Sequence, residues 1–344
     1  MNKYKTKELT MNKLTKIGTS ALCGSLAAIA SANAGSLSVS GGADLSYSSV
    51  EKIVTGNPIG MGSNMTFTGT GELDNGTAFT LSIAHTNQAA YSSGNVTLDM
   101  PSLGSLIITQ GGSGTGIDRI DDMMPTAWEE SYDTGTGANL RSVAGAGGST
   151  DIEWALSGDL LPEGLATYIS WSPHPDGSAN SDKGSSGDVT SNVIGHGWDI
   201  VLDYANPLGM VEGLTLFGGY SLIETIGSDH KSNGWGAKYA VGGLTVGYQE
   251  TTEENPKDGS NVNSYDNQAY GVSFNINDNL SVSYGAHKST QDNVGADVDL
   301  ETKSAQIAYT LGGAAIKIAE SDVENATYGT SDYNGTLIGV TLAF

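Results

Sequence analysis

The chain has little cysteine, little positive charge and no long apolar run outside its N-terminal segment. Among its 344 residues, Cys23 is the one cysteine, and 15 basic residues face 38 acidic ones, a formal net charge of −23. The rest of the chain therefore has no disulfide and no thiol chemistry. The negative charge argues against nucleic acid or an anionic membrane surface as a partner. Without a run of ~20 apolar residues, only a closed barrel could carry this chain across a bilayer.

Residues 1–34 have the three parts of a secretory signal peptide. Lysines precede the apolar run 17–30, and Ala32-Asn33-Ala34 is an A-x-A cleavage site. The run is short for a spanning helix, which favours a cleaved signal over a membrane anchor. Removing five lysines and one glutamate with it leaves 10 basic and 37 acidic residues in a mature chain of 35–344. Translation starts at Met1 or Met11, because Met11 alone opens a complete signal.

The mature chain is rich in glycine and in period-two alternation. Glycine accounts for 48 of 344 residues, about twice its usual share of about 7%. Apolar residues alternate with Ser, Thr, Gly and Asn in segments separated by turn residues, a pattern typical of β-strands. Sixteen strands are predicted, at 36–47, 64–72, 77–85, 95–100, 104–109, 151–157, 165–171, 198–205, 213–222, 235–241, 244–248, 270–276, 280–284, 305–311, 316–318 and 335–344.

The connections between these strands alternate in length. Seven short turns, such as Gly242-Gly243 and Gly312-Gly313, join strands in pairs, and mostly long polar connections join one pair to the next. Short turns at one rim and long loops at the other are a feature of outer-membrane barrels. A secreted β-sandwich also alternates but does not predict this regular change in turn length. The expected fold is all-β: a transmembrane antiparallel β-barrel of about 16 strands.

Two segments resemble those of Gram-negative outer-membrane general diffusion porins, which have sixteen strands. The last strand places Ile338, Val340, Leu342 and Phe344 on one face and ends on the aromatic residue. Such an ending resembles the signal read by the outer-membrane barrel assembly machinery, with Phe344 as the assembly signal. The long connection 112–149 resembles the third porin loop, which folds inward and narrows the barrel. The preceding connection near 88–91 is shorter than a strict porin plan would have.

This resemblance implies a function and a set of partners. The chain would be a non-enzymatic, water-filled channel for passive diffusion of small hydrophilic solutes and ions. It would reside in the Gram-negative outer membrane, as a homotrimer, in contact with lipid and lipopolysaccharide.

The resemblance also implies which residues form the pore. The expected constriction consists of Asp118, Arg119, Asp121, Asp122, Glu129, Glu130 and Arg141. Strand parity adds a lumen wall of Asp99, Asp151, Glu153, Asp199, Asp203, Lys238 and Lys317, with Asp44 and His287 as further candidates. Carboxylates outnumber bases in this set, so the pore is expected to prefer cations.

Other chemistry receives weaker support. No cofactor is expected; Asp118, Asp121 and Asp122 could hold Ca²⁺ loosely, although no EF-hand loop follows them. The enzyme alternative is an outer-membrane phospholipase, because His287-Lys288-Ser289 puts an imidazole and a hydroxyl on one strand face. His287 has lumen parity, however, whereas the pair in that enzyme faces lipid. A surface adhesin with a β-sandwich fold is a third alternative, and it leaves the terminal Phe344 unexplained.

Overall fold

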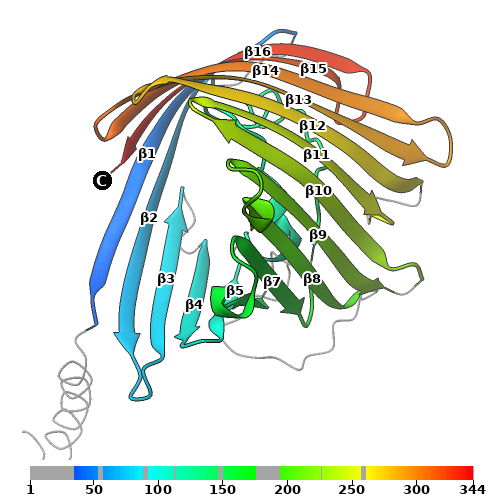
Figure 1. Ribbon diagram of the computed structural model, residues 1–344. Helices are drawn as coiled ribbons and strands as arrows, with labels where there is room; N and C mark the ends of the chain where they lie inside the picture. The colour runs from blue at the N-terminus through cyan, green and yellow to red at the C-terminus, as the bar shows by residue number, and fades with distance from the viewer. Residues whose placement is uncertain are drawn as a thin grey trace, which may run out of the picture.

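The computed structural model describes residues 35–52, 57–87, 92–111, 114–145, 150–175, 194–225, 227–256 and 261–343. Within them, sixteen antiparallel strands form one closed barrel (Figure 1). The strands are β1 Leu37–Val50, β2 Ile59–Glu72, β3 Ala78–Thr86, β4 Ser93–Met100, β5 Gly104–Gln110, β6 Asp151–Leu156, β7 Leu165–Ser172, β8 Ile194–Ala205, β9 Leu214–Thr225, β10 His230–Val241, β11 Leu244–Glu254, β12 Val262–Asn277, β13 Leu280–Asn293, β14 Val298–Leu311, β15 Ala314–Ala326 and β16 Ser331–Ala343. The predicted signal segment 1–34 and Phe344 lie outside the described residues.

The barrel closes where the first strand meets the last. In β1, Leu45 pairs with Val340 of β16 on one side and with Met61 of β2 on the other. Closure leaves no strand edge unpaired, as a bilayer without hydrogen-bonding partners requires. The predicted count of sixteen strands and the antiparallel barrel are confirmed. Among the described residues, no helix is long and apolar enough to cross a bilayer.

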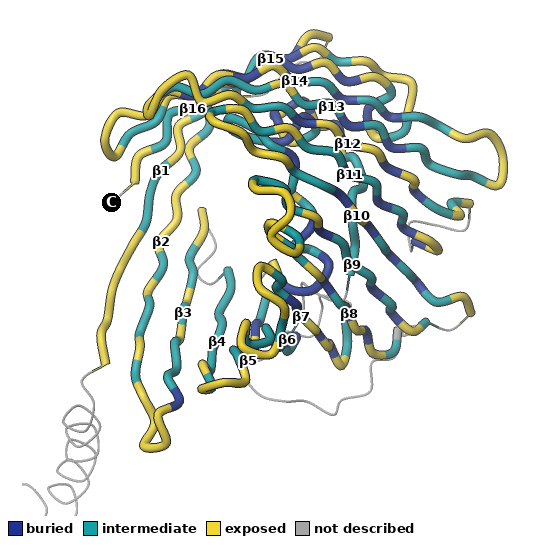
Figure 2. Tube along the Cα trace, viewed as in Figure 1, coloured by how far each residue is buried: buried dark blue, intermediate teal, exposed yellow. Residues whose placement is uncertain are grey.

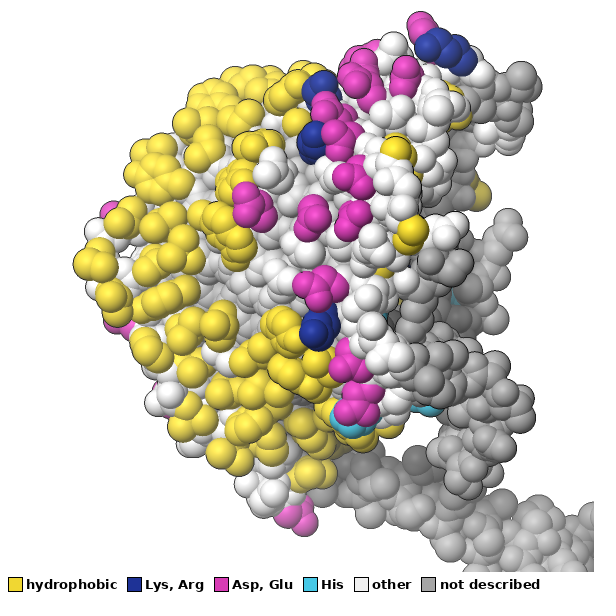
Figure 3. Space-filling model, turned by 90° about the vertical axis from the view of Figure 1, so that its right-hand side faces the viewer, with side chains coloured by type: hydrophobic (Ala, Val, Ile, Leu, Met, Phe, Trp, Pro, Cys, Tyr) yellow, Lys and Arg dark blue, Asp and Glu magenta, His cyan; other side chains and the backbone are white. Residues whose placement is uncertain are grey.

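Each strand presents one apolar and one polar face. In β12 and β13, Phe274 and Tyr284 are exposed on the outside, whereas Ser283, between the apolar positions, accepts a hydrogen bond from the long loop. Apolar side chains form a broad band on the outer surface (Figure 3). Buried residues recur along β8 to β15, whereas β1 to β5 are mostly intermediate or exposed (Figure 2). Side chains of the polar inner face are therefore buried mainly on the β8–β15 side of the barrel.

Several strands extend beyond the apolar band. The ring of Tyr248 lies 5.7 Å from that of Trp235 and 5.1 Å from that of Tyr270, as in an interfacial aromatic girdle. Farther from the short turns lies a charged belt (Figure 3). Lys288 of β13 and Asp299 of β14 form an ion pair of 2.6 Å near the outer ends of these strands. β11 ends at Glu254 and β12 begins at Val262, so both strands extend well into the connection expected between the predicted strands 244–248 and 270–276. Beyond the lipid both faces are polar, and no apolar alternation marks the strand there.

Candidate functional site: the long loop and the inner wall

The connection between β5 and β6 follows the polar inner wall of the barrel. It starts with the 3₁₀ helix η1, Gly116–Ile120, which packs against β7 to β10. Ile117 and Ile120 are almost fully buried in a small apolar cluster with Val201 and Phe217. Val201 of β8 and Phe217 of β9 occupy alternate positions that face the lumen. The loop therefore buries its apolar side chains against two apolar residues of an otherwise polar face.

The loop then runs along the wall as two arms. On the outgoing arm, the Ala127 amide donates to Ser283 Oγ at 2.8 Å and the Trp128 amide to Gln306 Oε1 at 3.0 Å. On the return arm, Thr251 Oγ1 donates to the Ser142 carbonyl at 2.8 Å. Ser283 and Gln306 lie nearer the short-turn rim than Thr251 does, so the two arms occupy different depths.

Arg119 anchors the start of the loop. Its Nε lies 3.1 and 3.0 Å from the two carboxylate oxygens of Glu153, and a second guanidinium nitrogen also contacts Glu153. Glu153 is fully buried and also accepts from the Gly116 amide at 2.8 Å and from Ser170 Oγ at 3.0 Å. The guanidinium lies 3.9 Å from the ring centre of Tyr168. Such a bidentate, buried pair restricts both partners strongly.

Arg141 anchors the return arm in the same way. Its Nε donates to Glu253 Oε2 at 3.0 Å and its Nη2 to Oε1 at 2.5 Å. His230 Nε2 lies 2.9 Å from the same carboxylate. Glu253 was absent from the predicted site because its part of β11 lies beyond the expected end of that strand. Its parity with Gln249 and Thr251 would have identified it as an inner-wall residue.

Glu130 forms a third, fully enclosed anchor. Its carboxylate accepts from the Met124 amide at 2.7 Å and lies 2.5 Å from His287 Nε2. His287 Nδ1 lies 2.8 Å from Ser131 Oγ. His287 thus faces the lumen and contacts the loop, whereas the histidine of the phospholipase pair faces lipid. Its expected partner Ser289 does not contact it in this way, because Ser289 Oγ lies 2.7 Å from Tyr328 Oη.

The predicted wall carboxylates have varied surroundings. Asp199 is buried and accepts from the Ile117 amide at 3.0 Å, and buried Asp151 accepts from Thr109 Oγ1 at 2.7 Å. Asp99 accepts from Ser105 Oγ at 2.5 Å beside a short turn. Asp203 is half-buried on β8, on the parity of Asp199. Of these four, Asp199 bonds directly to the loop, at Ile117.

Four other carboxylates of the loop lie close enough to influence one another: Asp121, Asp122, Glu129 and Asp133. Asp122 and Asp133 are exposed and the others half-buried. Burial, with the nearby Asp122 and Asp118 carboxylates, raises the pKa of Asp121 to about 6. Burial also raises the pKa of Asp133, and Asp122 adds to the effect. These mutual influences place the four in one electrostatic cluster, here called the carboxylate edge. Asp133 was not predicted, because it lies beyond Glu130, the last carboxylate of the predicted constriction.

Two of the predicted lysines lie near this edge. Lys238 Nζ is 3.8 Å from Met123 Sδ, and Lys317 Nζ is 5.5 Å from the ring centre of Trp128. Burial raises the pKa of Glu129, Asp133 adds to the rise, and Lys317 opposes it. Predicted Asp118 is turned toward its own backbone, where it accepts from the Gly114 amide.

Across the lumen, the inner face of β2 to β5 carries hydroxyl groups. In register, Thr68 pairs with Ser82 and Thr80 with Thr97, and the Thr68 and Ser82 hydroxyls lie 3.4 Å apart. Arg119 and Arg141 are the only arginines of the chain, and both are bonded to wall glutamates. The carboxylate edge therefore meets no arginine cluster on this facing wall.

Metal and pocket chemistry find little support within the described part of the chain. No three His, Cys, Asp or Glu side chains among those residues converge to hold a metal ion, Asp118, Asp121 and Asp122 included.

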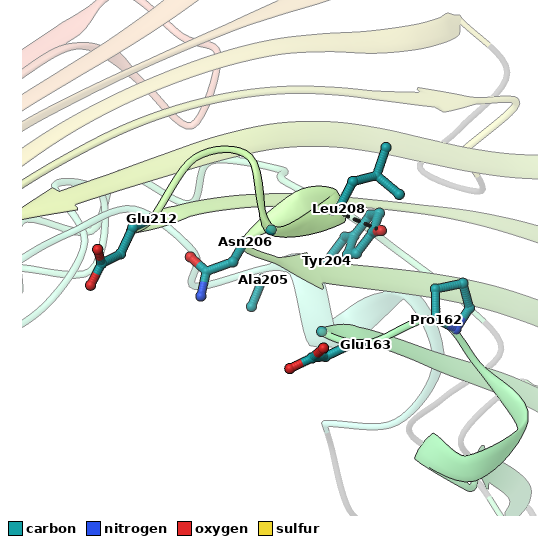
Figure 4. A pocket seen from close by; sticks show the side chains of 9 residues that line it. Pro162, Glu163, Tyr204, Ala205, Asn206, Leu208 and Glu212 are labelled. Carbon is teal, nitrogen blue, oxygen red and sulfur yellow. Dashed lines mark hydrogen bonds between the residues drawn. The ribbon is translucent and has the colours of Figure 1, made fainter.

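A cavity of about 690 Å³ lies between the β6–β7 and β8–β9 turns (Figure 4). Its Glu163 and Glu212 come from different turns and do not meet, and Tyr204 Oη accepts from the Leu208 amide at 3.0 Å.

Solved structures share this architecture at low sequence identity. OmpF of Salmonella typhi in complex with daunomycin matches with a TM-score of 0.66 at 14% identity, covering 90% of this chain and 97% of that one. OmpT of Vibrio cholerae in its trimer form matches at 0.62 and 10%, covering 90% and 99%. An anion-selective porin from Comamonas acidovorans matches at 0.60 and 14%, covering 90% and 100%.

The family assignment comes from the sequence itself. No curated protein matches the chain. Residues 18–344 match the family described as Gram-negative porin. The chain therefore belongs to the Gram-negative porin family, the non-enzymatic β-barrel channels of the outer membrane through which small solutes diffuse passively.

Proposed function

We propose that this porin prefers cations, and that the long loop narrows the lumen and sets the preference through its carboxylate edge. The observation that carries this proposal is the division of charge on the loop. Arg119 and Arg141 are bonded to buried Glu153 and Glu253, whereas Asp122 and Asp133 are exposed. The loop's two arginines are thus paired with glutamates at the wall, whereas the carboxylates of Asp122 and Asp133 are open to solvent.

The strength of such an effect depends on distance and solvent. Charges a few ångströms apart near a protein surface interact with about 4 kcal/mol at an effective dielectric of 20. A cation passing close to Asp122 or Glu129 would be stabilised by part of this interaction energy, which is well above thermal energy. Charges at the outer mouth are screened beyond about 8 Å at physiological salt. The carboxylate edge should therefore outweigh the many acidic residues of the outer connections.

The fold alone does not decide selectivity. One structure with the same architecture is described as anion-selective, so the sign of the preference has to come from individual side chains. Lys238 and Lys317 are the opposing charges near the edge, and they are outnumbered by its four carboxylates. The hydroxyl-lined wall of β2 to β5 adds no positive charge opposite them.

Reversal potentials across a KCl gradient test the proposal. The unmodified channel should prefer K⁺ over Cl⁻, and the triple variant Asp121→Asn, Asp122→Asn, Glu129→Gln should lose most of that preference. The matched control is the triple variant Glu254→Gln, Asp292→Asn, Asp297→Asn, which also removes three charges, at the outer ends of β11 to β14. Anion preference in the unmodified channel, or equal effects of the edge and control variants, would refute the proposal.

A trimer is the second part of the proposal. The outer face of β1 and β2 exposes large apolar residues, among them Leu37 and Met61, each 75% exposed. OmpT of Vibrio cholerae has a trimer form with the same fold. Cross-linking of the detergent-extracted protein should give a three-chain band, and a band of one chain only would contradict it. Export by residues 1–34, assembly through Phe344 and contact with lipopolysaccharide are proposed from the sequence alone.

A further inference from the structure

Glycines of the inner wall lie directly beneath apolar side chains of the long loop. Gly219 of β9 pairs in register with Gly234 of β10, and Gly247 of β11 pairs with Gly271 of β12. Gly339 of β16 is a fifth. Glycine weakens a strand interior and often marks a close approach of another chain segment. Here the approaching segment is the loop.

The space above each glycine is already occupied. A Cβ atom at Gly247 would lie 2.5 Å from Cδ and 3.2 Å from Cγ of Pro125, and one at Gly271 would lie 2.8 Å from the same Cδ. At Gly234 it would meet Thr251 Cγ2 of the neighbouring strand at 2.7 Å and Ile120 Cδ1 of the loop at 2.9 Å. At Gly219 it would meet Ile117 Cγ1 of the loop at 3.1 Å and Val201 Cγ2 of β8 at 3.2 Å.

The same relation recurs farther round the barrel, at β16. A Cβ atom at Gly339 would lie 2.7 and 2.8 Å from two ring carbons of Trp128. Ile117, Ile120, Pro125 and Trp128 thus each rest on a glycine. The wall glycines Gly219, Gly234, Gly247, Gly271 and Gly339 are here called the glycine track.

Not every inner-wall glycine belongs to the track. Gly285 of β13 pairs with Gly271 and has the lumen parity of Ser283 and His287. A Cβ atom there would meet only the Tyr270 carbonyl oxygen, at 3.7 Å, an ordinary contact. Gly285 therefore differs from its neighbour in one respect, the absence of a loop residue above it.

We propose that the glycine track determines the width of the channel, by letting the long loop lie flat against β9 to β12 and β16. The outgoing arm would otherwise stand off the wall by the thickness of a side chain. Because protein interiors are close-packed, an added methyl group has to displace the loop or the wall. The loop borders water and the wall is held by strand hydrogen bonds, so the loop moves, toward the lumen. The inference rests on the proposed role of the loop as the constriction.

Single-channel conductance of paired glycine variants tests the inference. Gly247→Ala should lower conductance by roughly 1.2-fold to 2-fold, while Gly285→Ala, with the same added methyl group, should leave it nearly unchanged. In Gly247→Ala the colliding atoms belong to the side chains of Pro125 and Met124. Adding Pro125→Ala to Gly247→Ala removes the proline ring and should restore conductance to the level of Pro125→Ala alone.

A second pair covers the case in which Gly247→Ala fails to fold. Gly339→Ala should lower conductance, and Trp128→Leu added to it should restore the level of Trp128→Leu alone. The heat-induced gel shift identifies folded barrels. Folded Gly247→Ala and Gly339→Ala channels with unchanged conductance, equal losses in Gly285→Ala, or no rescue by the loop variants would overturn the inference.

Reversal potentials on the same channels separate this inference from the proposed cation preference. Track variants should change conductance with little change in K⁺ preference, because they alter no charge. A channel that lacks cation preference but narrows in Gly247→Ala would refute the carboxylate edge and support the track. The opposite result would refute the track alone.

Discussion

Where the long loop meets the wall, Arg119 and Arg141 each bond to a buried glutamate, whereas on the lumen side Asp122 and Asp133 are exposed. The wall side adds the enclosed Glu130–His287 contact and buried Ile117 and Ile120. Residue types alone would have assigned all these charges to one filter. We infer from this difference that a charge near a pore contributes to selectivity only where no opposite charge neutralises it.

The largest effect is expected on the wall side. Arg119→Ala leaves the fully buried Glu153 carboxylate without its cation, and breaking such a pair costs about 3–5 kcal/mol. The heat-induced gel shift should occur at a lower temperature, and the open channel should fluctuate as the loop detaches. Asp122→Ala is the control on the lumen side and should leave the transition nearly unchanged. Equal losses in both variants would remove the distinction between the two sides.

The two faces of the wall itself give the next effect. Phe274 is 45% exposed on the apolar band, and arginine there should cost about 2–4 kcal/mol. Ser273→Arg places the same side chain on the inner face, where it should mainly alter conductance. Urea unfolding from liposomes measures the stability and bilayer recordings the conductance. Similar destabilisation at both positions would show that the two faces are misassigned.

A smaller, pH-dependent effect should come from Asp121 on the lumen side. Burial raises its pKa to about 6, above the ordinary value of about 3.9. Its carboxylate should therefore gain charge between pH 5 and 7, and K⁺ preference should rise over that interval.

The same pKa shift also affects stability. Because the folded pKa is raised, the stabilising contribution of protonated Asp121 is complete below the unfolded pKa and is lost as pH rises through about 6. Asp121→Asn should flatten the selectivity profile between pH 5 and 7 and the stability profile between about pH 4 and 6, where the unfolded and folded pKa values lie. An unchanged pH profile in this variant would exclude Asp121 as the source.

The sequence predicts the strands well where lipid acts on them. Contact with hydrocarbon forces alternate positions of β12 and β13 to be apolar, so Phe274 and Tyr284 are easily assigned to the outside. Beyond the lipid, as at Glu253, neither face needs to be apolar, and the predicted strands end too early. The sequence also does not predict which glutamates pair with Arg119 and Arg141, because these partners come from other strands and no local pattern connects them. The glycine track is visible only once the loop is in place.

The central claim, that the carboxylate edge selects cations, can be tested within a single channel. Protein refolded from residue 35 onward has no cysteine, so Asp122→Cys provides a unique thiol at the edge, and Lys288→Cys provides one on the outer belt as a control. Reversal potentials are measured before and after reaction with a cationic or an anionic thiol reagent. At Asp122→Cys the cationic reagent should lower K⁺ preference and the anionic reagent should restore it. At Lys288→Cys neither reagent should change the reversal potential. No change at Asp122→Cys, or equal changes at both positions, would contradict the central claim.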